Sequence, residues 1–112
     1  MITVLVRIKL PADKQDREAW LEHAKRIAPN FLGLDGLVRK HFVLGEDGYG
    51  GGVYTWESRA KAEAFYAGPW RQGIIDMFGT EPEFIWFESP VIVDNEAGEV
   101  KLDETGFRRS AA

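Results

Sequence analysis

The stretch from Leu34 to Glu57 reads LDGLVRKHFVLGEDGYGGGVYTWE and decides the fold. Two β-rich runs, 34–44 and 53–57, flank a loop that is crowded with glycine and acidic residues. Glycine supplies the positive φ angles that tight turns and bulges require. The stretch therefore predicts a β-hairpin at the centre of the fold.

The glycine triplet Gly50-Gly51-Gly52 is interpreted as part of a flexible hairpin loop. The alternative is a phosphate-binding loop, but such a loop follows a strand and opens a helix, with a lysine placed to reach the phosphate. These glycines lead instead into the predicted strand 53–57. Nucleotide binding is therefore not expected.

The sequence on either side of the hairpin predicts two strands and three helices. Alternating apolar residues predict a strand over 2–10, and the run 83–88 predicts the last main strand. Asp13 is the expected N-cap of a first helix, which should end near Ala28 with a kinked extra turn to Leu32. Ser58 can cap a second helix, and Pro69 can start a short third one.

The resulting order of strand, helix, strand, strand, helix, strand predicts a ferredoxin-like α+β fold (β-α-β-β-α-β) with an antiparallel sheet. Helices that follow these strands can cover only one face of the sheet. The other face keeps apolar residues such as Leu5 whichever way the strands point. An apolar surface of that size usually marks an interface. We therefore expect a homodimer in which two sheets pack face to face to form a dimeric α/β barrel.

Composition indicates the extent of the domain and argues against some classes of binding partner. The chain has 112 residues, of which 45% are hydrophobic, so it is long enough for one core, and we assign a single domain to residues 1–93. Residues 94–112 are mostly polar and are expected to be a C-terminal tail or a dimer arm. The net charge of −4 and the scattered basic residues argue against nucleic acid and against an anionic membrane as partners.

The sequence contains no cysteine, which excludes disulfides, thiolate chemistry and Cys-based zinc sites. No apolar run approaches the roughly 18 residues that a membrane span requires, and the N-terminus begins directly with a predicted strand. We therefore expect a soluble, unprocessed cytoplasmic protein.

Several motifs resemble the YdhR-like proteins, which are proposed monooxygenases of the dimeric α+β barrel superfamily. The matching features are the string Gly33-Leu34-x-Gly36-Leu37, His41 in the first hairpin strand, Gly51-Gly52-x-Tyr54-x-Trp56 in the second, and Ser58 with the alanine-rich helix that runs to Tyr66. The similarity extends over roughly residues 1 to 93. It is specific for the fold and does not specify the chemistry, since that superfamily includes oxygenases, isomerases, haem-degrading enzymes and proteins without an assigned reaction.

The resemblance implies a cofactor-independent monooxygenase that needs no flavin, haem or metal. An acidic phenol or enol would lose a proton in an apolar pocket, and its anion would itself reduce oxygen. The expected ligand is a small aromatic or polyketide-like molecule.

We assign the candidate site residues by their type and position. His41 is the candidate catalytic base and Arg71 the candidate anion partner. The expected walls of the substrate pocket are aromatic: Trp20, Phe31, Tyr54, Trp56, Tyr66 and Trp70. Core packing is the alternative for each aromatic residue, a structural or interface histidine is the alternative for His41, and a surface arginine is the alternative for Arg71.

Two other functions stay open at this point. One is a non-catalytic, small-ligand-binding or stress-related dimeric module. The other is an isomerase or lyase on the same barrel, in which His41 transfers a proton without oxygen. Convergence of His41 and a tyrosine hydroxyl on one cavity would favour catalysis. No metal site is expected, because the two histidines have no carboxylate at a metal-ligand spacing.

Overall fold

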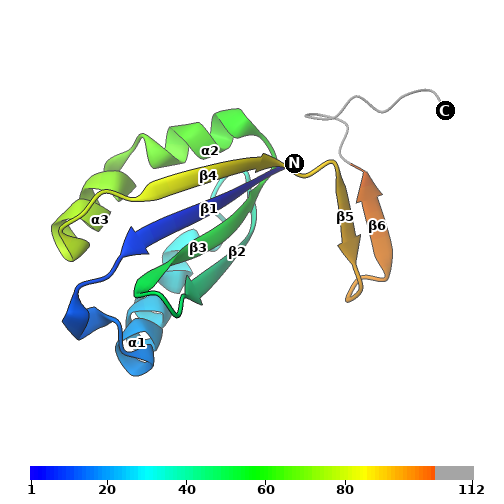
Figure 1. Ribbon diagram of the computed structural model, residues 1–112. Helices are drawn as coiled ribbons and strands as arrows, with labels where there is room; N and C mark the ends of the chain where they lie inside the picture. Colours follow the sequence, from blue (N-terminus) through cyan, green and yellow to red (C-terminus); the bar gives the residue numbers. More distant parts are fainter. Residues whose placement is uncertain (103–112) are drawn as a thin grey trace.

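The computed structural model describes residues 1–102. Its strands are β1 (Ile2–Lys9), β2 (Leu37–Leu44), β3 (Tyr49–Trp56), β4 (Glu83–Glu88), β5 (Val91–Asp94) and β6 (Glu99–Leu102). Its α-helices are α1 (Arg17–Ile27), α2 (Arg59–Tyr66) and α3 (Pro69–Phe78), and two 3-10 turns, Ala12–Lys14 and Ala28–Phe31, flank α1. Figure 1 shows the main sheet with its helices and a separate C-terminal hairpin.

The main sheet has the order β2-β3-β1-β4, and every neighbouring pair is antiparallel. With α1 after β1 and α2 after β3, this is the ferredoxin-like α+β arrangement that the sequence predicts. In β1 the residues alternate between buried and half-buried. Ile2, Val4, Val6 and Ile8 form the buried row that packs against the helices, and the other row faces away from them.

The helix boundaries follow their capping residues. Ser58 accepts a hydrogen bond from the backbone N–H of Lys61 at the start of α2, and Gly79 ends α3 in the left-handed conformation at φ 74°. The N-cap of α1 is Asp16, whose side chain accepts from the N–H of Ala19. The assignment of this cap to Asp13 was therefore wrong, because Asp13 lies in the preceding 3-10 turn.

The glycine triplet is part of a buried strand, so its interpretation as a flexible loop was wrong. Strand β3 begins at Tyr49, and Gly50, Gly51 and Gly52 are all buried within it. Gly51 has φ 154°, and a Cβ atom there would lie only 1.8 Å from the carbonyl oxygen of Val6. Close approach of β3 to β1, rather than flexibility, is what requires glycine at this position.

The C-terminal segment after β4 forms its own two-stranded sheet. Strand β5 does not prolong β4, because Pro90 separates the two and β5 pairs with β6. The β5–β6 hairpin stands beside the main sheet (Figure 1), whose last strand ends at Glu88. The remainder of the expected tail, residues 103–112, lies outside the described residues.

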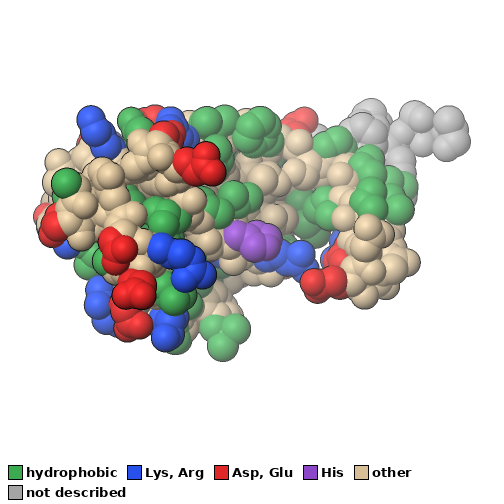
Figure 2. All heavy atoms as spheres, turned by 60° about the horizontal axis from the view of Figure 1, so that its bottom comes forward, with side chains coloured by type: hydrophobic (Ala, Val, Ile, Leu, Met, Phe, Trp, Pro, Cys, Tyr) green, Lys and Arg blue, Asp and Glu red, His purple; other side chains and the backbone are tan. Residues whose placement is uncertain are grey.

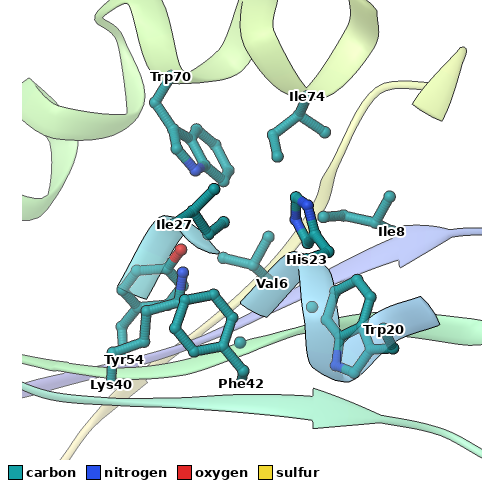
Figure 3. Close-up of a pocket in the computed structure, with 12 residues that line it drawn as sticks. Val6, Ile8, Trp20, His23, Ile27, Lys40, Phe42, Tyr54, Trp70 and Ile74 are labelled. Atoms are coloured by element: carbon teal, nitrogen blue, oxygen red, sulfur yellow. The ribbon is translucent and has the colours of Figure 1, made fainter. Parts of the chain in front are cut away.

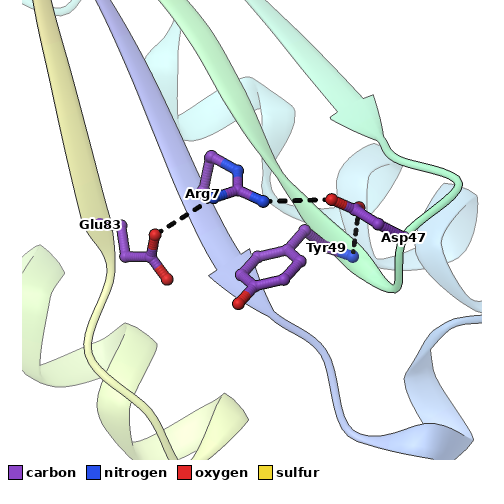
Figure 4. A network of polar contacts seen from close by, with 4 residues as sticks. All are labelled: Arg7, Asp47, Tyr49 and Glu83. Carbon is purple, nitrogen blue, oxygen red and sulfur yellow. Dashed lines mark hydrogen bonds and ion pairs between the residues drawn. The ribbon is translucent and has the colours of Figure 1, made fainter.

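The face of the sheet opposite the helices is partly apolar and partly charged. Ile85 and Phe87 are 42% and 52% exposed on this face. At one end of it, Arg7 donates to Glu83 and to Asp47 at 3.2 and 3.1 Å and covers the ring of Tyr49, as Figure 4 shows. These contacts tie β4, β1 and the β2–β3 turn together on the open face. Exposed ion pairs of this kind stabilise a fold only slightly.

Candidate functional site

Two adjoining cavities lie between the helices and the sheet. The outer cavity has a volume of about 270 Å³ and opens between α1, α2 and α3. Its lining residues are His23, Ile27, Asn30, Phe31, Phe65, Trp70, Gly73, Ile74 and Met77. The lining is mostly apolar with few polar groups, as is usual for sites that bind small organic molecules.

The inner cavity reaches down to the sheet. It holds about 20 Å³, roughly enough for one water molecule. Its lining residues are Val6, Ile8, Trp20, His23, Ile27, Lys40, Phe42, Gly51, Gly52, Tyr54, Trp70 and Ile74. His23, Ile27, Trp70 and Ile74 line both cavities, so the two spaces meet at these side chains (Figure 3).

The glycines of β3 create the room for this cavity. A Cβ atom at Gly52 would lie 2.9 Å from Cε of Lys40 and 2.9 Å from Cε1 of Tyr54. A Cβ atom at Gly50 would lie 3.0 Å from the indole ring of Trp20. The absence of side chains on this part of β3 therefore leaves room for the side chains of Lys40 and Trp20.

Lys40 is the most unusual titratable residue of the site. Its Nζ lies 3.5 Å from the ring centroid of Phe31, 3.8 Å from that of Phe42 and 4.6 Å from that of Tyr54. Within residues 1–102, Nζ has no carboxylate or hydrogen-bond partner. Burial lowers the pKa of Lys40 to about 7, although the three ring faces favour the charged ammonium and act in the opposite direction. Near neutral pH this amine is therefore available both as a base and as a cation.

Tyr54 and His23 complete the polar part of the cavity. Burial raises the pKa of Tyr54, the neighbouring Tyr66 raises it further, and the indole of Trp70 acts in the opposite direction, so the phenol stays protonated. Burial lowers the pKa of His23, and the positive charges of Arg26 and Lys40 lower it further. Nδ1 of His23 lies 3.4 Å from Nη2 of Arg26, so a neutral His23 accepts this bond. The cavity thus combines an amine, a phenol and a neutral imidazole in apolar surroundings.

No protein-family model matches the sequence, and no curated protein matches it. Solved structures do match. A proposed antibiotic biosynthesis monooxygenase from Deinococcus radiodurans superposes with a TM-score of 0.65 at 14% identity, over 84% of this chain and 97% of that one. A second such protein, from Nitrosomonas europaea, has a TM-score of 0.61 at 17% identity, over 80% and 98% of the two chains.

A protein of unknown function from Nitrosomonas europaea has a TM-score of 0.64 at 12% identity, over 79% of this chain and 87% of that one. The chain has the ferredoxin-like fold of these proteins. At such low identities the likeness establishes the fold alone, and the chemistry of the site has to be argued from its own residues.

Four of the aromatic residues that the sequence suggested for the pocket do line the two cavities. Tyr54 and Trp20 line the inner cavity, Phe31 lines the outer one, and Trp70 lines both. The indole N–H of Trp20 is buried and has no hydrogen-bond partner within residues 1–102. These four residues come from α1, the following 3-10 turn, β3 and α3, which the ferredoxin-like fold brings together.

Trp56 and Tyr66 do not line these cavities. Trp56 is fully buried, and its indole N–H donates a hydrogen bond of 3.1 Å to the hydroxyl of Tyr66. The two residues belong to an aromatic cluster that also includes Tyr54, Phe65, Trp70, Phe84 and Trp86. Their role in this structure is core packing, with the buried donor and acceptor satisfying each other.

The two residues assigned to catalysis lie outside the cavities. His41 is exposed on the open face of the sheet, opposite Val53 in the β2–β3 register. Arg71 is exposed on α3, and its Nη2 donates to Oε1 of Glu81 at 2.7 Å. The convergence of His41 with a tyrosine hydroxyl on one cavity is therefore absent from the described residues. Lys40, the residue before His41, occupies that position instead.

Sequence reasoning missed Lys40, because both faces of β2 carry apolar residues. In a β-strand successive side chains point to opposite faces. Phe42, an apolar residue of β2, shares a face with Lys40 rather than with His41. Val43 shares the opposite face with His41, so the apolar residues alone do not show which side chain faces the helices.

Among residues 1–102, no group of three or more histidine, aspartate or glutamate side chains is placed to hold a metal ion. Over the same residues, no helix has the length and apolar character that crossing a membrane requires.

Proposed function

We propose that the protein is a cofactor-independent monooxygenase acting on a small acidic aromatic or polyketide-like substrate, with Lys40 as its base. One observation carries this proposal: Nζ of Lys40 lies among three aromatic rings at the wall of the inner cavity, where Tyr54 also lies. The fold shared with proposed antibiotic biosynthesis monooxygenases supports it as an analogy of architecture.

The proposed reaction begins with proton transfer to Lys40. A pKa of about 7 leaves a large fraction of this amine neutral at neutral pH, so it can accept a proton from a phenol or enol. The resulting ammonium then lies next to the substrate anion and stabilises it. Low polarity around the cavity strengthens this attraction.

The remaining steps use the substrate as the reductant. Its electron-rich anion reduces molecular oxygen, one oxygen atom enters the substrate, and the other leaves as water. In this proposal the protonated phenol of Tyr54 donates a hydrogen bond to the substrate oxygen, while Trp20, Phe31 and Trp70 hold the ring and exclude water.

We also propose a homodimer formed through the open face of the sheet, in the manner of the YdhR-like proteins. The exposed Ile85 and Phe87 support it, because monomeric proteins rarely leave such apolar patches uncovered. The β5–β6 hairpin carries Val91, Val93, Val100 and Leu102 on one face, all of them exposed, and Figure 2 shows hydrophobic side chains gathered there. In such a dimer His41 becomes an interface residue, and a catalytic role for it would depend on the partner chain.

An oxygen-uptake assay tests the proposed reaction. The purified protein is mixed in air with a panel of phenols and anthrone-like compounds, with no cofactor added, and oxygen consumption is followed with an electrode. We expect saturable uptake with at least one compound, and its loss in the Lys40→Met variant. Saturable binding of these compounds without any uptake would favour the non-catalytic binding module. Isomerised product without oxygen consumption would favour the isomerase or lyase.

A further inference from the structure

A lysine amine that faces a cavity and has no carboxylate beside it can act as a nucleophile as well as a base. We propose that Lys40 forms a reversible imine with the aldehyde or ketone group of a hydrophobic carbonyl compound held in the two cavities. This proposal uses the same cavities as the monooxygenase reaction, but it needs neither oxygen nor that reaction.

The first argument is the surroundings of Nζ. It lies over the rings of Phe31, Phe42 and Tyr54, and within residues 1–102 it has no ion-pair partner. A carboxylate would hold the amine in its protonated, non-nucleophilic state. The structural lysines of this protein show the contrast, since Lys61 is paired with both Asp35 and Glu57.

The second argument is the shape of the cavities. The inner space of about 20 Å³ fits a carbonyl oxygen or the one water molecule that imine formation releases. The outer cavity of about 270 Å³ has an apolar lining that fits the hydrocarbon part of the same ligand. A ligand that extends from the outer cavity into the inner one would therefore present its head group to Lys40, which lines the inner cavity (Figure 3).

The chemistry balances within the site. The neutral amine of Lys40 attacks the carbonyl carbon to give a carbinolamine, which loses water to form the C=N bond. Tyr54, whose phenol stays protonated, can donate a hydrogen bond to the carbonyl oxygen during the attack. His23 faces the same space from α1 and can carry the proton that moves from nitrogen to the departing water.

The charged and titratable groups around Lys40 are compatible with a neutral amine. His23 and Tyr54 line the inner cavity with it, and neither carries a negative charge at neutral pH. A lysine with an ordinary pKa of about 10.4 is about 99.9% protonated at pH 7.5. Burial lowers the pKa of Lys40 to about 7, so a much larger fraction of its amine is neutral at that pH. Lys40 should therefore react much faster than the surface lysines.

Reductive trapping tests the proposal. The full chain is incubated without oxygen at pH 7.5 with benzaldehyde and sodium cyanoborohydride, which reduces an imine to a stable secondary amine. The site is then located by peptide mass spectrometry at short reaction times. We expect one adduct per chain, on Lys40, formed at least about tenfold faster than on any other lysine, in line with its larger neutral fraction.

Two variants sharpen the result. Lys40→Arg keeps a positive charge and should lose the fast adduct, whereas the matched surface variant Lys61→Arg should keep it. Gly73→Leu places a side chain in the outer cavity, where a Cβ atom meets nothing within 4 Å. It should slow labelling by benzaldehyde about tenfold, because the new side chain occupies space that this ligand needs. Labelling by the smaller acetaldehyde should be unchanged.

Adducts spread over the surface lysines, with Lys40 no faster than they are, would overturn the proposal. This outcome can be read from the wild-type chain alone, so it does not depend on whether any variant folds. Anaerobic trapping also separates this inference from the proposed oxygenation. Trapping without oxygen uptake would support the imine and contradict the proposed monooxygenase reaction. Oxygen uptake without trapping would support Lys40 as a base and contradict the imine.

Discussion

Lys40 and His41 are neighbours in β2, yet their side chains lie on opposite faces of the sheet. Nζ of Lys40 lies 3.5 Å from the centroid of the Phe31 ring on the helix side, while His41 pairs with Val53 and is exposed on the open side. This relationship follows from the alternation of side chains along a strand. It places a lysine, rather than a histidine, at the inner cavity, where it could contact a bound small molecule.

The first prediction compares these two neighbours. Lys40→Met removes the amine and keeps a long apolar side chain, so any oxygen uptake should fall by roughly a hundredfold or more, the usual contribution of a positioned base. His41→Gln should change the rate constant by less than about threefold, because an exposed residue outside the cavity contributes little. Steady-state oxygen uptake measures both. The reverse pattern would restore His41 as the catalytic base, as the sequence first suggested.

The pH dependence of activity gives a second prediction. The base must be neutral before it accepts a proton, and burial lowers the pKa of Lys40 to about 7. Activity should therefore rise with pH through about 7 and then level off. Rate measurements between pH 5.5 and 9, on a substrate that does not itself titrate in this range, check this. A rate that keeps rising up to pH 9 would mean that the amine titrates like an exposed lysine.

The same pKa predicts how stability changes with pH. The folded pKa of Lys40 is below the unfolded value of about 10.4, so between pH 7 and that value the unfolded chain binds more protons. Stability should therefore increase with pH over this interval. Between pH 7 and 9 this contribution should be about 2 kcal/mol.

Urea denaturation of wild-type protein and Lys40→Met at pH 7 and pH 9 measures this contribution. The increase should be smaller in the variant by that amount, because methionine does not titrate. Lys61→Met is the matched control, since Lys61 is exposed on α2 and should leave the increase unchanged. An equal increase in wild-type protein and Lys40→Met would contradict the lowered pKa.

A further prediction concerns the floor of the inner cavity. Gly52→Ala introduces a Cβ atom 2.9 Å from Cε of Lys40 and from Cε1 of Tyr54, so both side chains must move. We expect the free energy of unfolding to fall by about 1 to 3 kcal/mol and the pH midpoint of activity to rise as Lys40 moves toward solvent. Gly73→Ala on α3 is the control and should stabilise the protein by about 0.5 to 1 kcal/mol. If the free energy of unfolding and the pH midpoint of activity were unchanged in Gly52→Ala, the contact of Gly52 with Lys40 and Tyr54 would not be tight.

The last prediction concerns self-association. Sedimentation at micromolar concentration should give twice the chain mass of 12.7 kDa. Phe87→Asp places a charge on the exposed apolar face of the sheet and should weaken the dimer at least tenfold. Leu32→Asp is the control, because Leu32 is 88% exposed outside the sheet. A wild-type monomer, or equal effects of the two variants, would rule out the open face as the interface.

The architecture was predictable because it rests on local patterns. Alternation in residues 2–10, capping by Ser58, the proline at 69 and the glycine at 79 each predict an element, and the order of the elements predicts the ferredoxin-like sheet. The four cavity residues Trp20, Phe31, Tyr54 and Trp70 were also suggested by their aromatic character. Core and cavity residues share that character, so Trp56 and Tyr66 were not distinguishable from them.

What only the tertiary structure decided was which side chains meet. A single residue of register separates Lys40 from His41, and composition alone does not say which faces the helices. The triplet at 50–52 looks like a loop in the sequence, and only the approach of β1, Lys40 and Trp20 shows why it lies in a strand. Local chemistry determines strands and helices, whereas the site depends on contacts between residues far apart in the chain.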